Sequence, residues 1–190
     1  MPTPQTEIGL IEALLGSDHF AALPAEVRRL HGTATGSYTG SAKIGRGNSL
    51  LSRFCAAVAG LPGATDTAHT QVDIATATQA GAQTWTRTFV DQHGKVHVMR
   101  SKLWAGQGLL GQGLLLERLG LVCFGFALST DTMGFNWRVE QVHALGIPLP
   151  ARLFSGVNAR SFSDATGYRI EVNASLPLAG LIISYHGHLA

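Results

Sequence analysis

The 190-residue sequence contains few charged residues: Asp, Glu, Lys and Arg make up 14% of it, against roughly a quarter in typical soluble domains. The formal net charge is only +2, and no basic cluster exceeds the pair Arg28 and Arg29. Nucleic-acid binding needs a concentrated basic face, so the sequence argues against it. Hydrophobic residues reach 45%, which argues equally against intrinsic disorder.

The sequence is also poor in cysteine and in long apolar runs. Cys55 and Cys123 are isolated within apolar segments, as expected for small buried hydrophobes rather than for a disulfide or a CxxC site. No signal-peptide pattern opens the chain, and no apolar run approaches the roughly 18–20 residues of a membrane-spanning helix. These absences predict a cytoplasmic protein of bacterial type, with no membrane span.

Catalytic and metal-binding patterns are equally scarce. There is no GxSxG motif, and the acidic residues are nowhere clustered. His186 and His188 lie two apart, which places them on one face of a strand, but no zinc-like spacing surrounds them. We therefore predict neither a metal site nor a bound cofactor, and keep these two histidines as the only, weak, metal candidates.

One glycine motif resembles a nucleotide-binding fingerprint. Gly106, Gly108 and Gly111 match GxGxxG, but the preceding run is too polar for a central parallel strand and too few residues follow for a doubly wound domain. The segment from Gly106 to Gly113 is therefore predicted to be a flexible or bulged loop. Such a loop could gate the mouth of a barrel.

The sequence does contain the period-two alternation of apolar and polar residues that is typical of β-strands. From about Gly32 onward, short runs of alternating apolar and polar residues are broken by glycine-centred turns, which predicts eight to ten antiparallel strands. The predicted fold is mainly β, a barrel-like (calycin-like) antiparallel sheet, because closure removes exposed edges; a two-sheet sandwich is the alternative. We predict a single domain over residues 1–190, with a helical segment in residues 1–30 capping the β body.

A second predicted helix follows the first strand. It runs from Ser49 to Gly60, and its apolar stripe, expected to face the core, contains Leu50, Leu51, Phe54, Val58 and Leu61. The three tryptophans, Trp85, Trp104 and Trp137, are also predicted to lie in the core.

The candidate binding residues lie on the strand around Arg87. Trp85, Arg87 and Phe89 share one strand face; if that face is the interior, Arg87 is a buried cation that needs a partner, for which Glu117 is the preferred internal candidate. The alternative is that Arg87 extends toward a barrel end. Trp85 and Tyr38 complete this set, which predicts a hydrophobic or partly anionic small molecule in an apolar cavity.

Several short motifs together resemble a known family. They are Leu23-Pro24 with Arg28-Arg29-Leu30-His31-Gly32, Gly45-Arg46-Gly47, Gly60-Leu61-Pro62, Thr84-Trp85-Thr86-Arg87-Thr88-Phe89, Glu117-Arg118-Leu119-Gly120, Gly146-Ile147-Pro148-Leu149-Pro150, Leu176-Pro177-Leu178-Ala179-Gly180-Leu181 and Tyr185-His186-Gly187-His188-Leu189. In this order they resemble the bacterial domain-of-unknown-function family 4166, over about Phe20 to Leu189.

The resemblance implies no established activity. It implies a domain that is often fused to an NAD(P)-binding dehydrogenase- or epimerase-like domain; this chain is expected to stand alone, so such a partner would be a separate protein. It also marks His31, Arg46, Trp85, Arg87, Glu117 and Tyr185 as motif positions, and Arg46 is added to the predicted ligand-binding residues. Two alternatives to ligand binding stay open: a cofactor-free cyclase or isomerase with His31, Glu117 or Tyr185 as acid or base, and a protein-interaction module.

Overall fold

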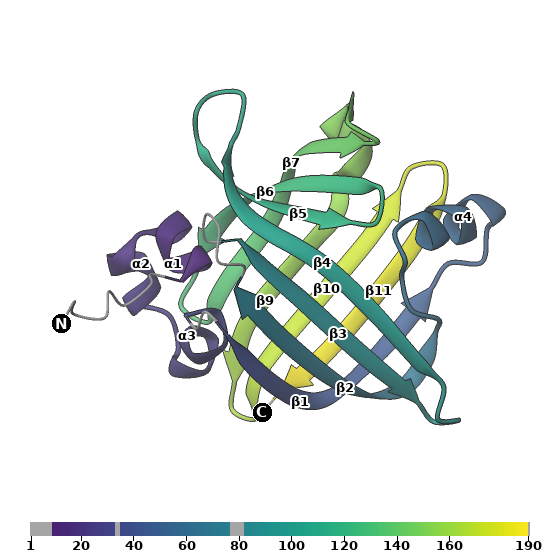
Figure 1. Cartoon of the computed structure of the whole chain (residues 1–190), viewed down its shortest axis with the longest axis horizontal. Helices are drawn as coiled ribbons and strands as arrows, with labels where there is room; N and C mark the ends of the chain where they lie inside the picture. The colour runs from purple at the N-terminus through teal and green to yellow at the C-terminus, as the bar shows by residue number, and fades with distance from the viewer. Residues whose placement is uncertain (1–8, 33–34, 77–81, 190) are drawn as a thin grey trace.

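The computed structural model describes residues 9–32, 35–76 and 82–189, and its main feature is a closed antiparallel β-barrel (Figure 1). Ten strands pair in the order β6-β5-β4-β3-β2-β1-β11-β10-β9-β7, and the pairing of β6 with β7 closes the sheet. The strands are β1 (Gly36–Arg46), β2 (Thr65–Thr76), β3 (Gln83–Asp91), β4 (Val96–Gln107), β5 (Gly113–Leu119), β6 (Val122–Thr130), β7 (Gly134–Ala144), β9 (Gly156–Asp164), β10 (Gly167–Leu176) and β11 (Gly180–Leu189). The predicted barrel is therefore confirmed over the sandwich.

A short extra strand and a turn extend one side of the barrel. β8 (Ile147–Leu149) pairs with the end of β7, beyond the part of β7 that pairs with β9. The short 3-10 helix η1 (Ala151–Phe154) then leads into β9.

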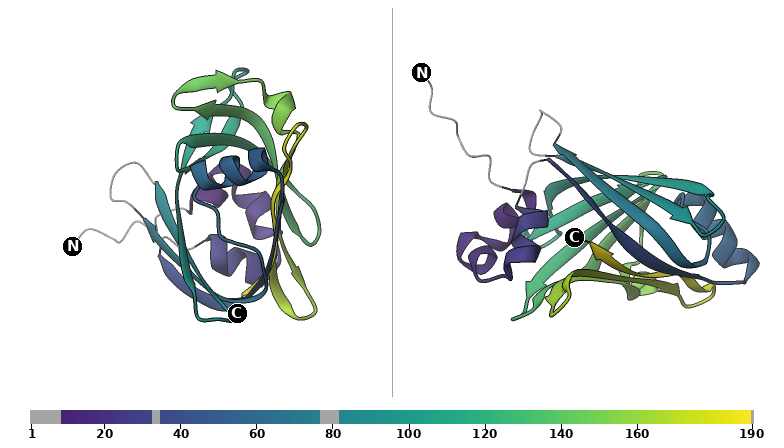
Figure 2. Two further views of the ribbon diagram at one scale, coloured as in Figure 1. Left: turned by 90° about the vertical axis from the view of Figure 1, so that its right-hand side faces the viewer. Right: turned by 90° about the horizontal axis from the view of Figure 1, so that it is seen from below.

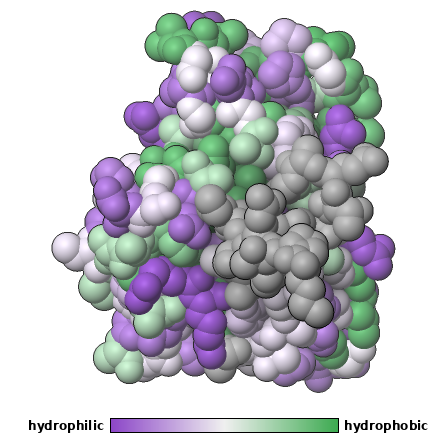
Figure 3. All heavy atoms as spheres, turned by 60° about the vertical axis from the view of Figure 1, so that its left-hand side comes forward, coloured by the Kyte–Doolittle hydropathy of each residue, from purple (hydrophilic) through white to green (hydrophobic). Residues whose placement is uncertain are grey.

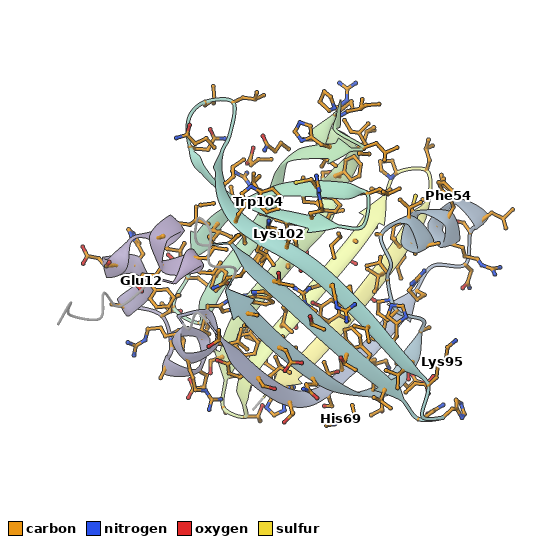
Figure 4. All side chains as sticks on the ribbon, viewed as in Figure 1. Glu12, Phe54, His69, Lys95, Lys102 and Trp104 are labelled. Atoms are coloured by element: carbon orange, nitrogen blue, oxygen red, sulfur yellow. The ribbon has the colours of Figure 1, made fainter. Side chains whose placement is uncertain are left out.

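The inward faces follow from the period of two. On β3, the alternating residues Trp85, Arg87 and Phe89 are buried, whereas the threonines between them are half-buried. A glycine-centred hairpin turn follows β3, with Gly94 at a φ of 76°. Trp104 is a correction: it is half-buried on the outer side of β4, beside the exposed Lys102, because the buried positions of that strand are Met99, Ser101 and Leu103 (Figure 4).

Three short helices pack at one end of the barrel (Figures 1 and 2). They are α1 (Leu10–Leu15), α2 (Ser17–Ala21) and α3 (Ala25–His31). Apart from His31 at the end of α3, they lie within the predicted helical segment, residues 1–30, of which residues 1–8 lie outside the described residues. These helices insert apolar side chains into the main core: Leu10, Ile11, Phe20, Leu23, Val27 and Leu30. On the face that carries them, hydrophobic residues gather in the upper part and hydrophilic ones at the lower left (Figure 3).

The fourth helix, α4 (Leu50–Val58), lies at the opposite end (Figure 2, left). The helix is where the sequence predicts it, but its apolar stripe is only partly buried, because the small residues Ser52 and Ala56 occupy its buried face. Hydrogen bonds anchor that face to the turn and strand that follow β10: Ser49 Oγ donates to the carbonyl of Ala179 at 2.8 Å, and Ser52 Oγ to that of Leu181 at 2.5 Å.

The first three residues of the predicted stripe consequently point outward, whereas Val58 and Leu61 are half-buried and Leu61 packs against the core. Leu50 is 83% exposed, Leu51 45% and Phe54 65%. Within the residues that the structure describes, neither α4 nor any other helix has the length and apolarity needed to cross a membrane.

Candidate binding site: an apolar cavity with a buried ion pair

A cavity of about 390 Å³ lies inside the barrel at the end that carries α4. Apolar side chains from α4 and from most of the strands form its wall, including Phe124, Phe126 and Trp137 on β6 and β7, and Phe54 on α4. Its volume lies within the range of ~300–1,000 Å³ that is usual for small-molecule sites. The barrel therefore has an internal space of ligand size next to an exposed helix.

A buried ion pair forms the polar part of the cavity wall. Arg87 Nη2 lies 3.3 Å from Glu117 Oε1, and the two side chains are only 7% and 8% exposed. Arg87 Nη1 donates a hydrogen bond of 2.9 Å to Ser101 Oγ, and the guanidinium lies 5.1 Å from the centre of the Trp85 ring. β4 separates β3 from β5, and the small Ser101 on β4 allows the guanidinium to extend across to Glu117.

The pair has a simple electrostatic consequence. The two charges neutralise each other, so the site as a whole presents no net charge to a ligand. Two of the five guanidinium N–H groups are used in the hydrogen bonds to Ser101 and Glu117, which leaves donor capacity at the cavity wall.

Two further polar groups lie on the same wall. Tyr185 on β11 is buried, and burial raises the pKa of its phenol, a rise that the charge of Arg87 partly opposes. Trp137 is buried too, and its Nε1 has no hydrogen-bond partner among the described residues. A buried donor without a partner is costly, which makes Trp137 Nε1 a candidate donor for a polar group.

His31 lies elsewhere, in the aromatic core between the cavity and α1–α3. Its ring stacks on Trp85 at 5.4 Å, meets Phe135 edge-on at 4.9 Å, and its Nε2 lies 3.1 Å from the hydroxyl of Tyr168. Burial, with a smaller effect of the Arg87 charge, lowers the pKa of His31 to about 3. His31 is therefore neutral at ordinary pH, and it does not line the cavity.

Three other predicted residues also lie outside the cavity wall. Arg46 Nη1 donates to the carbonyls of Leu61 (3.2 Å) and Pro62, which ties the end of β1 to the segment between α4 and β2. Tyr38 donates to the carbonyl of Arg29 at 3.0 Å, at the α3 end. Trp85 lies under the guanidinium of Arg87 and borders a separate void of about 20 Å³, which has room for about one water.

The histidine candidates for a metal site lie on the outside of the barrel. His186 Nδ1 is 3.6 Å from Glu171 Oε1 at the surface, and His188 Nε2 is 2.8 Å from the carbonyl of Thr166. Over residues 9–32, 35–76 and 82–189, no three His, Cys, Asp or Glu side chains gather as metal ligands would.

The segment from Gly106 to Gly113 forms the hairpin connection between β4 and β5, in agreement with the loop predicted there. A Cβ added at Gly113 would lie 3.5 Å from Leu14 of α1, so this loop lies at the end of the barrel opposite α4. It is not placed to gate the cavity mouth.

Sequence reasoning missed the aromatic wall of the cavity. Phe124, Phe126 and Phe154 lie near one another, with ring centres 5.8 Å and 6.0 Å from Phe124, and Trp137 lies 5.6 Å from Phe126. The alternation of large apolar residues along β6 and β7 was the available signal, but only strand pairing shows that these residues face one space.

Comparison with known families agrees with the motif pattern. The family model described as "Domain of unknown function (DUF4166)" matches residues 23–189, so the chain belongs to this family. No curated protein matches the sequence.

Proposed function

We propose that this DUF4166 protein binds a hydrophobic small molecule, with a polar oxygen-containing end, inside its barrel. The observation that carries the proposal is the apolar cavity of about 390 Å³ whose wall contains the Arg87–Glu117 pair. An apolar cavity surrounding a few convergent polar groups is the usual form of a small-molecule site.

The ion pair favours a particular kind of polar end. Glu117 already neutralises Arg87, so a ligand carboxylate would meet Glu117 and a ligand amine would meet Arg87. A neutral oxygen, such as a hydroxyl or carbonyl, accepts from the guanidinium without adding a charge. The orphaned Nε1 of Trp137 offers a second donor to the same class of ligand.

The apolar wall provides the main part of the affinity. A ligand that buries roughly 300 Å² of apolar surface gains about 7 kcal/mol at the usual coefficient. Part of that gain offsets the lost freedom of the ligand. We therefore expect dissociation constants of tens of micromolar or weaker for simple amphiphiles.

The first test is native mass spectrometry of the protein purified without added ligand, followed by titration with the fluorescent apolar dye Nile red. We expect saturable binding of the dye, and displacement by decanol at lower concentrations than by decanoic acid or decylamine. A folded protein that binds none of these molecules would contradict the proposal.

A pair of matched variants tests the location. Ala174→Phe on β10 fills part of the cavity and is expected to weaken Nile red binding, because Ala174 lines it. Ala105→Phe makes the same substitution at an exposed position of β4, and is expected to leave binding unchanged. Equal effects of the two substitutions would place the dye outside the cavity.

A second candidate function uses the same space. Glu117 and Tyr185, a carboxylate and a phenol on one cavity wall, supply the proton-transfer groups that a cofactor-free isomerase or cyclase needs. His31 is not part of this candidate site, because it is buried in the aromatic core away from the cavity. Recovery of a bound molecule in chemically altered form would favour this function over simple binding.

A further inference from the structure

The mouth of the cavity has an apolar rim, defined by large hydrophobic side chains that are exposed around α4 and the neighbouring turns. Leu50 and Leu178 are 83% and 90% exposed. The other members of the rim are Leu51, Phe54, Leu121, Leu145, Ile147 and Leu153. Single exposed leucines are ordinary, but a contiguous group of this kind marks an interaction surface.

Contacts between the elements show that the rim is continuous. The turn between β5 and β6 touches α4, since a Cβ added at Gly120 would overlap the carbonyl oxygen of Val58. The turn after β7 joins this same turn, through a hydrogen bond of 3.0 Å from Leu145 N to the carbonyl of Leu121. The turn after β10 is joined to α4 by Ser49. Figure 2 (left) views this end directly, with α4 across it.

The charges of the rim have one sign. The segments that form it, residues 46–64, 118–130, 141–163 and 172–189, contain arginines but no Asp or Glu. Arg53, Arg118 and Arg152 are exposed there. Two acidic residues lie nearby. Asp66 at the start of β2 is exposed and lies 3.5 Å from Lys43 Nζ. Asp91, in the turn between β3 and β4, accepts hydrogen bonds at Oδ1 from the backbone N–H groups of His93 and Lys95.

An open depression beside α4 adds a place for an anion. It has a volume of about 600 Å³ and is bordered by Arg46, Asn48 and Arg53. Arg46 Nε has no hydrogen-bond partner among the described residues. Guanidinium groups are suited to phosphate oxygens, which accept several N–H donors in one plane.

A backbone feature of the rim supports a role for its side chains. Leu145 has a φ of 52°, a left-handed conformation that leucine rarely adopts, and its side chain is 72% exposed. This turn position normally favours Asn or Gly. Backbone strain at a residue whose side chain stays exposed in the free protein is consistent with a surface that is buried when a partner binds.

From these observations we propose that the rim docks on the surface of an anionic phospholipid membrane. The leucines enter the boundary between headgroups and acyl chains, and the arginines meet lipid phosphates. The cavity then opens toward the bilayer, so that an apolar ligand enters it without crossing water. Docking itself does not depend on which molecule the cavity binds.

The experiment is flotation of the full chain with vesicles of phosphatidylcholine, with and without phosphatidylglycerol. We expect the chain to float with the anionic vesicles, and less so as salt is raised. The rim variant Leu50→Gln/Leu178→Gln is expected to bind at least about tenfold more weakly, because two apolar side chains no longer enter the lipid. Neither residue lines the cavity, so Nile red binding without vesicles should be unchanged.

The matched control is Leu109→Gln/Leu110→Gln. These leucines are 98% and 93% exposed in the loop between β4 and β5, which lies at the other end of the barrel, and their replacement should leave flotation unchanged. Arg53→Gln and Arg152→Gln should each weaken binding to anionic vesicles about fivefold. Arg100→Gln, on the exposed side of β4, should not.

Three outcomes would overturn the proposal. The wild-type chain could stay unbound with anionic vesicles, or the Leu109/Leu110 control could lose as much binding as the rim variant. The rim substitutions could instead change the oligomeric state while vesicles stay unbound, which would make the rim an interface between copies. Failure of Nile red binding with normal flotation would count against the cavity ligand and not against docking.

Discussion

Removing one partner of the Arg87–Glu117 pair should destabilise the protein far more than removing both. Arg87→Met leaves the Glu117 carboxylate unpaired at a position where both side chains are less than a tenth exposed. Breaking a buried pair in this way costs about 3–5 kcal/mol of unfolding free energy, because the remaining charge is desolvated without compensation. Glu117→Leu should cost a similar amount for the same reason.

The double variant Arg87→Met/Glu117→Leu should recover most of this loss. Both charges are then absent, and replacing a buried pair by apolar residues of similar volume is often neutral or stabilising. We expect its free energy of unfolding to lie within about 1 kcal/mol of the wild-type value. It should also keep Nile red binding but lose the preference for decanol over decylamine.

The assay is urea unfolding followed by far-ultraviolet circular dichroism, with tryptophan fluorescence as a second probe. A matched control is the surface pair Arg138–Glu140, which is shorter at 2.7 Å but has side chains 79% and 33% exposed. Arg138→Met should cost less than about 1 kcal/mol, because solvent screens the pair. The reasoning is refuted if Arg87→Met costs no more than Arg138→Met, or if the double variant loses the sum of the two single effects.

Three further predictions concern stability. Because burial lowers the pKa of His31 to about 3, below the ordinary histidine pKa of 6.5, the unfolded chain takes up a proton first on acidification. The contribution of neutral His31 to the free energy of unfolding is complete above pH ~6.5 and is smaller by about 3 kcal/mol near pH ~4.5. In urea unfolding at several pH values, the His31→Phe variant should lack this part of the loss. Identical pH profiles of the variant and the wild type would contradict the prediction. Gly47→Ala should lower the free energy of unfolding by about 2 kcal/mol or more in urea unfolding, because the added Cβ would overlap the carbonyl oxygen of Leu181. An unchanged free energy of unfolding would show that α4 shifts to make room for it. Leu145→Asn should relieve roughly 1 kcal/mol of backbone strain and thereby raise the temperature of the unfolding midpoint. The same substitution should weaken vesicle flotation. A lower midpoint would argue against strain at this turn.

Much of the barrel could be predicted because strand faces follow directly from sequence position. The alternation in β3 puts Arg87 on one face with Trp85 and Phe89, and Glu117 was the partner predicted if that face is the interior. The structure shows that the face is interior and that the pair forms. The glycine-centred turns likewise mark hairpins, among them the one that contains Gly94.

The lining of the candidate site was less predictable. His31 matches a family motif as well as Arg87 does, yet it lies in the aromatic core, and Arg46 bonds to loop carbonyls. A motif position records that a residue recurs, but it does not distinguish a cavity wall from a structural contact.

The sequence by itself therefore determined the β class, the shared strand face of Trp85, Arg87 and Phe89, and the location of the helices. Periodicity and turn chemistry are local properties, so a single sequence carries them. Only the tertiary structure decided that the barrel closes between β6 and β7, that the cavity opens under α4 and that Leu50, Leu51 and Phe54 of α4 face outward. The orientation of α4 depends on the bond from Ser52 to Leu181, which are 129 residues apart, and no local pattern contains that contact.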